Sequence, residues 1–232
     1  MFYNISENLY ALGKIIIKPD KQFSFLSYLL TGKSNILIDT VPARYAEQFL
    51  QDIEDVIGTD QLDVIILNHS EEDHSGALKA LVEKYPKIPV YCTNACKIRL
   101  SSTLPHINYR IIHNHENLSV STYEFEFYET PGLHWDDNMV TFLKSDGVLF
   151  SNDLFGQYAG AEPPLDLNYS FKEILYAVTS YYERVFSNAT LEEKKVIATL
   201  NNLPLKMIAP GHGVILKNNI FDIVNYYMAH MK

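Results

Sequence analysis

The sequence predicts an α/β fold in which two mixed β-sheets are packed between outer layers of helices. Short runs of β-branched and aromatic residues alternate with segments whose apolar residues recur at helical spacing. This alternation occurs in both halves of the 232-residue chain, and no repeat or low-complexity stretch divides them. We therefore expect a single domain over residues 1–232, because this length suits one sizeable hydrophobic core.

The N-terminal half predicts strands first and then alternating helices and strands. Residues 15–19, 23–30 and 35–40 are β-branched or aromatic runs separated by turn residues. Residues 43–56 predict a helix, because apolar side chains repeat at helical spacing and Gly58 closes the segment. The following elements are a buried strand at 64–67, a helix at 77–85, and a strand at 90–92 with a helix behind it.

The C-terminal half predicts a group of strands, then two helices, a strand and a last helix. The predicted strands cover residues 109–113, 123–129, 138–144 and 148–152. Helical patterns occupy 171–186 and 191–202, and the second ends ahead of Pro204. A strand at 206–210 precedes a Gly-His-Gly loop and a terminal helix from Ile220 to Met231.

The composition excludes several classes of function. A formal charge of −9 argues against nonspecific nucleic-acid binding, which requires a basic surface. The N-terminus has no signal-peptide pattern, and no apolar run is long enough to span a bilayer. Cys92 and Cys96 are too few for a disulfide framework and lack the CxxC redox spacing, so we expect reduced thiols and a cytoplasmic protein.

The segment His69-Ser70-Glu71-Glu72-Asp73-His74 concentrates imidazoles and carboxylates directly after the apolar strand at 64–67. If the segment is extended, His69, Glu71 and Asp73 share a face and converge on one point, with His74 following as the chain turns into a helix. Burying so many carboxylates is costly unless cations neutralise them. The segment taken alone leaves two interpretations open, a metal site and a solvated acidic loop.

Three later residues favour the metal site. His134 lies in TPGLHW, Asp153 in LFSNDLFG and His212 in APGHG. Each follows a predicted strand and lies near a glycine, where a tight turn directs a side chain toward a shared sheet edge. A single histidine in such a loop is more often a surface residue, but four strand-end matches in order favour a common site.

These motifs resemble the metal-binding motifs of flavodiiron proteins, a branch of the metallo-β-lactamase superfamily. The similarity extends from FSFLSYLL and NILIDT through GHGVI, which is nearly the whole chain. It implies a metallo-β-lactamase-like αββα sandwich and two sets of iron ligands that share one carboxylate. The first set is His69, Glu71 and His134. The second set is Asp73, His74 and His212, and the shared bridging carboxylate is Asp153.

The ligand types favour iron over zinc. Hydrolytic members of the superfamily usually have HxHxDH, with a histidine at the position of Glu71. The carboxylate adds negative charge and a hard oxygen donor, so each metal has two histidines and a terminal carboxylate, close to the arrangement that suits ferrous iron and dioxygen. Zinc and manganese remain alternatives, because selectivity also depends on metal availability. The expected cofactor is a pair of non-haem irons with an oxo, hydroxo or peroxo bridge.

The resemblance also implies an electron supply that the sequence does not contain. Flavodiiron proteins carry a flavodoxin domain with FMN after the metal domain and work as dimers. This sequence ends at Lys232 and predicts no flavin site. We therefore expect an oxygen-binding sensor, a homodimer linked to a signalling partner such as one in chemotaxis. The alternatives are an O₂ or nitric oxide reductase served by a separate flavoprotein or rubredoxin, with peroxide as another ligand, and a zinc hydrolase, which Glu71 disfavours.

Three further residues are candidates for contacts around the metals. Trp135 follows His134 and is expected to pack against that ring. Phe25 and Leu26 stand where flavodiiron proteins often have Tyr and Asn, and Tyr158 stands where a His is expected. Fewer proton donors at Phe25 and Tyr158 would favour a long-lived oxygen adduct, although a change in packing alone explains them equally well.

Overall fold

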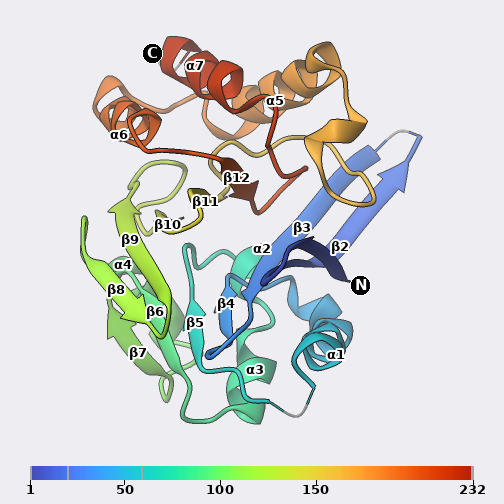
Figure 1. Cartoon of the computed structure of the whole chain (residues 1–232). Helices are drawn as coiled ribbons and strands as arrows, with labels where there is room; N and C mark the ends of the chain where they lie inside the picture. Colours follow the sequence, from blue (N-terminus) through green and yellow to red (C-terminus); the bar gives the residue numbers. More distant parts are fainter. Residues whose placement is uncertain (1, 20, 59, 231–232) are drawn as a thin grey trace.

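Two β-sheets form the centre of the protein in the computed structural model, which describes residues 2–19, 21–58 and 60–230. Helices lie outside both sheets, so the layers follow the order helix, sheet, sheet, helix (Figure 1). This is the layered arrangement that the alternating sequence patterns predict. Among the described residues, no helix combines the length and the apolar character needed to cross a membrane.

The first sheet has seven strands in sequence order, antiparallel from β1 to β4 and parallel from β4 to β7. Its strands are β1 (Phe2–Ser6), β2 (Leu9–Lys18), β3 (Lys21–Leu30), β4 (Ile36–Ile38), β5 (Val64–Ile66), β6 (Pro89–Cys92) and β7 (Asn108–Ile111). The inner strands are buried on both faces. Ile36 and Ile38 join the core between the sheets, whereas Leu37 faces the helices.

The second sheet has five strands in the order β12-β11-β10-β9-β8. These strands are β8 (Asn117–Val120), β9 (Tyr123–Glu129), β10 (Met139–Leu143), β11 (Val148–Asn152) and β12 (Met207–Pro210). Only the pair β11 and β12 is parallel, and in its register Asn152 lies opposite Pro210. The residues that follow these two strands, Asp153 and His212, therefore reach the same edge of the sheet.

Helices cover the outer face of each sheet (Figure 1). The first sheet is covered by helices from the N-terminal half, namely α1 (Ala46–Ile57), α3 (Leu78–Lys84) and α4 (Asn94–Ser101). The second is covered by α5 (Phe171–Val185), α6 (Leu191–Asn201) and α7 (Ile220–His230). The first turns of α5 and α6 are stabilised by capping boxes, which Ser170 forms with Glu173 and Thr190 forms with Glu193.

The structure differs from the sequence prediction mainly at the ends of elements. β1 and β8 were not predicted, because both are short strands that alternate between half-buried and exposed residues. The helix predicted from residue 43 begins with the 3₁₀ turn η1 (Ala43–Tyr45), and α1 starts only at Ala46. The terminal helix ends at His230, and its predicted end at Met231 lies outside the described residues. Cys92 and Cys96 are free and buried.

Candidate metal centre

The histidine- and carboxylate-rich segment leaves the end of β5 and turns at once into the short helix α2 (Glu72–Ser75). The Ser75 hydroxyl donates to the carbonyls of Ser70 and Glu71 at 2.7 and 3.0 Å, which fixes this turn. The prediction of an extended segment is therefore wrong beyond Glu71. Because the helical turn rotates Asp73 away from Glu71, the two carboxylates face different groups rather than one common point.

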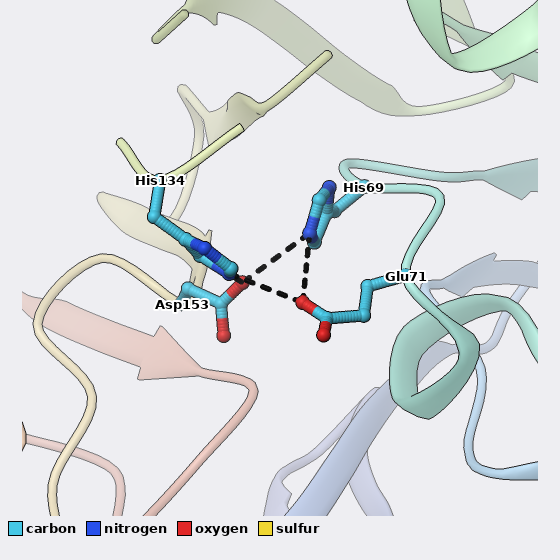
Figure 2. Close-up of side chains that lie close together, drawn as sticks. All are labelled: His69, Glu71, His134 and Asp153. Atoms are coloured by element: carbon cyan, nitrogen blue, oxygen red, sulfur yellow. Dashed lines mark hydrogen bonds and ion pairs between the residues drawn. The ribbon is translucent and has the colours of Figure 1, made fainter. Parts of the chain in front are cut away.

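Two groups of potential metal ligands result, and together they contain all seven predicted residues. The ligand atoms in each group lie within 4.8 Å of one another. The first group is His69, Glu71, His134 and Asp153 (Figure 2). The second group is Asp73, His74 and His212.

In the first group, two imidazoles face two carboxylates (Figure 2). Nε2 of His134 lies 3.1 Å from Oε2 of Glu71 and 3.3 Å from Oδ2 of Asp153. Nε2 of His69 lies 3.3 Å from the same Glu71 oxygen and 3.8 Å from the same Asp153 oxygen. Both rings thus direct Nε2, the nitrogen available to a metal, toward a common point.

The second group approaches the other oxygen of Asp153. Oδ1 of Asp153 lies 3.1 Å from Nε2 of His74 and 3.2 Å from Nε2 of His212. Asp73 closes the group, with its Oδ2 3.3 Å from Nε2 of His212. Asp153 therefore lies between the two groups and turns one carboxylate oxygen toward each, which is the position of a bridging ligand.

The polar atoms of these groups fit a pair of metal ions. Oδ1 of Asp73 and Oδ2 of Asp153 are buried without a hydrogen-bond partner. A buried carboxylate oxygen left in this way is costly unless a cation neutralises it. Imidazole nitrogens and carboxylate oxygens are ligands that divalent transition metals accept. Glu71 and Asp73 keep exposed fractions of 37% and 26%, so each group also has an approach from solvent.

Comparison with known proteins shows which family the chain belongs to. A profile described as ODP family beta lactamase matches residues 23–213, a range that contains all seven ligands. A relative from Vibrio vulnificus, named anaerobic nitric oxide reductase flavorubredoxin, is 37% identical over 217 residues, 91% of this chain. The chain belongs to the flavodiiron protein family.

Solved structures of flavodiiron proteins agree with this membership. Rubredoxin oxygen:oxidoreductase from Desulfovibrio gigas is 27% identical and superposes with a TM-score of 0.90 over 99% of this chain. A mutant of the flavo di-iron protein from Thermotoga maritima is 28% identical, with a TM-score of 0.88 over 99% of this chain. The predicted metallo-β-lactamase-like sandwich is therefore confirmed. The chain spans 44% of the Vibrio relative and 61% of each of these two solved chains.

Residues that are not ligands themselves hold two of the ligand histidine rings in place. Oδ1 of Asp137 lies 3.0 Å from Nδ1 of His69, and Oδ2 accepts from the Ser70 amide at 2.8 Å. On the other side, Nδ1 of His212 lies 2.8 Å from the backbone oxygen of Ser24. A partner on Nδ1 fixes the tautomer and leaves Nε2 free for a metal.

Asp39 joins the two strand ends that carry His69 and Asp153. Its carboxylate accepts from the backbone and side-chain amides of Asn68 at 2.6 and 2.9 Å. It also accepts from the side chain of Asn152 at 3.2 Å. Asn68 and Asn152 directly precede the two ligands, so Asp39 sets the distance between β5 and β11. Asp39 itself has a φ of 57°, which explains why β4 ends earlier than predicted.

The carboxylates of the site strongly favour protonated histidines in the absence of a metal. Burial opposes the charged ring, but hydrogen bonds with Asp137 and Glu71 prevail and raise the pKa of His69 to about 10. Burial likewise opposes a charge on His212 and His134, but the adjacent Asp153 carboxylate prevails and raises their pKa values to about 10 and about 9. Hydrogen bonds from His134 and His69 lower the pKa of Glu71 to about 2.

Two of the three residues predicted to surround the metals contact ligand rings. The Trp135 ring lies edge-on to His69, with centroids 4.9 Å apart, and 5.8 Å from His134. Phe25 lies edge-on to His212 at 5.6 Å. The rings that Tyr158 contacts are instead Phe23 and Tyr181, so its link to the ligands is indirect.

Sequence patterns missed several residues that support the centre. Asp137 had a weak signal, since it is a carboxylate three residues after His134. Tyr181 had none, because it is one of many tyrosines on a helix, yet its hydroxyl donates to Oδ1 of Asp153 at 2.9 Å. Phe23 stacks on His212 with centroids 4.5 Å apart, and its place in a strand run indicated only packing.

Proposed function

We propose that this flavodiiron domain holds two non-haem iron ions and binds dioxygen or nitric oxide for reduction. The observation that carries the proposal is the pair of ligand groups that share Asp153. The Vibrio relative is named a nitric oxide reductase, and the Desulfovibrio protein is named an oxygen:oxidoreductase, which supports the same reaction class here.

The ligand set favours iron. Glu71 gives the first group a carboxylate where hydrolytic relatives usually have a third histidine, and Asp73 gives the second group its own carboxylate. Two histidines and a carboxylate at each ion form a set that suits non-haem ferrous iron. When bound, the two ferrous ions would supply one electron each to the diatomic ligand.

The protein's own side chains hold the protons near this site. Asp137 keeps the Nδ1 proton on His69, so that Nε2 is the metal-binding nitrogen. Burial and the neighbouring Asp153 raise the pKa of Tyr181 well above its usual value, so its hydroxyl stays protonated and keeps donating to Asp153. This hydrogen bond withdraws charge from the shared carboxylate.

Oxygen sensing is the finer part of the proposal. The rings of Phe23 and Phe25 cover His212, and neither ring can donate a proton. Slow proton delivery lengthens the life of the oxygen-bound state, which then lasts long enough for a signalling partner to respond. We place this sensor in the cytoplasm as a homodimer that serves a signalling partner such as one in chemotaxis. Turnover as a reductase with a separate flavoprotein or rubredoxin is the alternative.

Anaerobic reconstitution with ferrous iron tests the proposal. We expect two irons per chain, and a stoichiometric dose of dissolved oxygen without reductant should produce a visible absorption band. A band that lasts many minutes supports sensing. A band that decays within seconds and returns whenever a reduced flavoprotein is added supports reduction and overturns sensing.

The same preparation tests the metal assignment. Iron-loaded protein that neither changes its spectrum with oxygen or nitric oxide nor consumes them would contradict the proposal. Two zinc ions after expression with both metals available, together with esterase or thioesterase turnover, would replace it with hydrolysis.

A further inference from the structure

A pocket of about 660 Å³ lies beside the metal centre, between Pro19, Gln22 and Phe23 of the β2–β3 hairpin and the helix α5. The hairpin extends from the first sheet toward the segment that leads into α5 (Figure 1). The pocket is lined by Pro19, Gln22, Phe23, Tyr158, Tyr169, Glu173, Tyr176, Ala177 and Ser180. This volume is within the range of pockets that bind small organic ligands, about 300–1,000 Å³.

Two aromatic residues that line the pocket, Phe23 and Tyr158, connect it to the metal ligands through side-chain contacts. The Phe23 ring stacks on His212 with an interplanar angle of 25° and centroids 4.5 Å apart. The Tyr158 ring contacts Tyr181 at 5.3 Å, and the Tyr181 hydroxyl bonds to Asp153. A molecule in the pocket is therefore separated from the second ligand group by one aromatic ring on the Phe23 side.

The pocket favours an aromatic ligand. Four of its lining residues are aromatic, namely Phe23, Tyr158, Tyr169 and Tyr176. Tyr176 is 76% exposed and Tyr158 is 40% exposed, an arrangement that leaves ring surface available for contact. Tyr169 is held rigidly, because its hydroxyl donates to Gln22 at 2.8 Å and accepts from the Gly160 amide at 3.0 Å.

The charge of the described lining disfavours an anionic ligand. Among the lining residues that the structure describes, the charged side chain is that of Glu173. A phosphate group normally requires a cation or free amides at a helix N-terminus, and at the start of α5 the Ser170 side chain already bonds the Glu173 amide. The amide of Gln22 and the hydroxyl of Ser180 supply neutral polar groups at the rim. A flat, uncharged ring system with carbonyl or hydroxyl substituents matches this lining.

We propose that this pocket binds a quinone, whose reduced form delivers electrons to the metal centre through Phe23 and His212. The proposal rests on the redox function proposed above. In the step, one hydroquinone loses two electrons and two protons and becomes the quinone. An iron pair held by the two ligand groups would, in its ferric state, accept one of these electrons at each ion, and both protons would pass to water. The two-electron donor thus matches the two metal ions.

Calorimetric titration of zinc-loaded protein with menadione, a bicyclic quinone, tests the pocket without any redox reaction. Replacing Tyr176 by alanine removes one ring contact, and we expect it to weaken binding about fivefold. Because Tyr176 is highly exposed, the substitution leaves the core intact. Phe221→Ala is the matched control, since Phe221 is 70% exposed and does not line the pocket, and it should leave the affinity unchanged.

Several outcomes would overturn the quinone site. One is the absence of menadione binding, and another is equal loss of affinity in Tyr176→Ala and Phe221→Ala. Tighter binding of FMN than of riboflavin and menadione would identify a phosphorylated flavin as the occupant instead. Because zinc-loaded protein reports only on the pocket, its result is independent of whether the iron-loaded protein reacts with oxygen or nitric oxide.

Discussion

Asp137 and Asp136 are adjacent carboxylates with different surroundings. Asp137 is buried and holds both His69 and the Ser70 amide, whereas Asp136 is largely exposed and pairs with Arg99 at 2.5 Å. The first contact orients a ligand ring, and the second is a surface ion pair of the kind that contributes little to stability. Substituting each of the two aspartates in turn therefore measures how much the Asp137–His69 contact contributes to metal affinity.

Asp137→Asn should weaken metal binding at the His69 group by about 10- to 100-fold, the effect typical of losing such a partner. The group that contains His74 and His212 should keep its metal, because Ser24 rather than Asp137 holds His212. Chelator competition followed by metal analysis measures the two affinities. Asp136→Asn is the control and should behave like the unaltered protein. Equal weakening by both substitutions would show that Asp137 has no specific role.

At the scale of elements, the start of α5 is a defined structural feature with consequences for the pocket. The Ser170 hydroxyl accepts from the Glu173 amide, and the Glu173 carboxylate accepts from the Ser170 amide. This capping box fixes where the helix begins, and Glu173 and Tyr176 lie in its first two turns beside the pocket. The cap thereby positions the pocket wall as well as the helix.

Ser170→Ala should lower the free energy of unfolding by about 1 kcal/mol, because the first turn loses a side-chain acceptor. Urea denaturation followed by circular dichroism measures this difference. Ser187→Ala provides the comparison, since Ser187 is exposed in the turn after α5 and should cost far less. An equal effect of the two substitutions would contradict a stabilising role for the cap.

The strength of the local pattern decided which elements could be predicted. The predicted α5 and α6 lie within one residue of the observed helices, because both have capping residues and regular apolar spacing. β8 was missed because it has four residues and an alternating, half-exposed pattern. The helical turn of α2 was also missed. A four-residue helix held by the Ser75 hydroxyl is too short to show a helical repeat of apolar residues in the sequence.

At the scale of the whole molecule, the metal centre couples stability to pH. In metal-free protein, the pKa values of His69, His212 and His134 are raised to about 10, 10 and 9. Protonation therefore stabilises the folded state fully below the unfolded pKa of about 6.5, and this contribution disappears as the pH rises through 9 to 10. Bound metal replaces these protons and removes the dependence.

Metal-free protein should accordingly have a lower melting temperature at pH 10 than at pH 6.5, while metal-loaded protein changes much less over that interval. Thermal unfolding followed by circular dichroism, at matched ionic strength, provides the measurement. At pH 7 the loaded protein should also melt at a higher temperature than the metal-free protein, because the metals compensate the buried carboxylates. A metal-free protein whose stability rises from pH 6.5 to 10 would contradict this account.

The sequence by itself determined the layered fold class, the main helices and the seven residues that converge on the centre. The fold class and the helices follow from local patterns, because apolar spacing encodes which face is buried, whereas the resemblance to flavodiiron proteins implied the full set of seven ligands. The resemblance already implied the division into two sets that share Asp153, and only the tertiary structure decided which oxygen of Asp153 faces each set. It also revealed Asp137, Tyr181, Asp39 and the aromatic pocket. Their partners are distant in the chain, so no local pattern could indicate contacts that strand register and helix packing create.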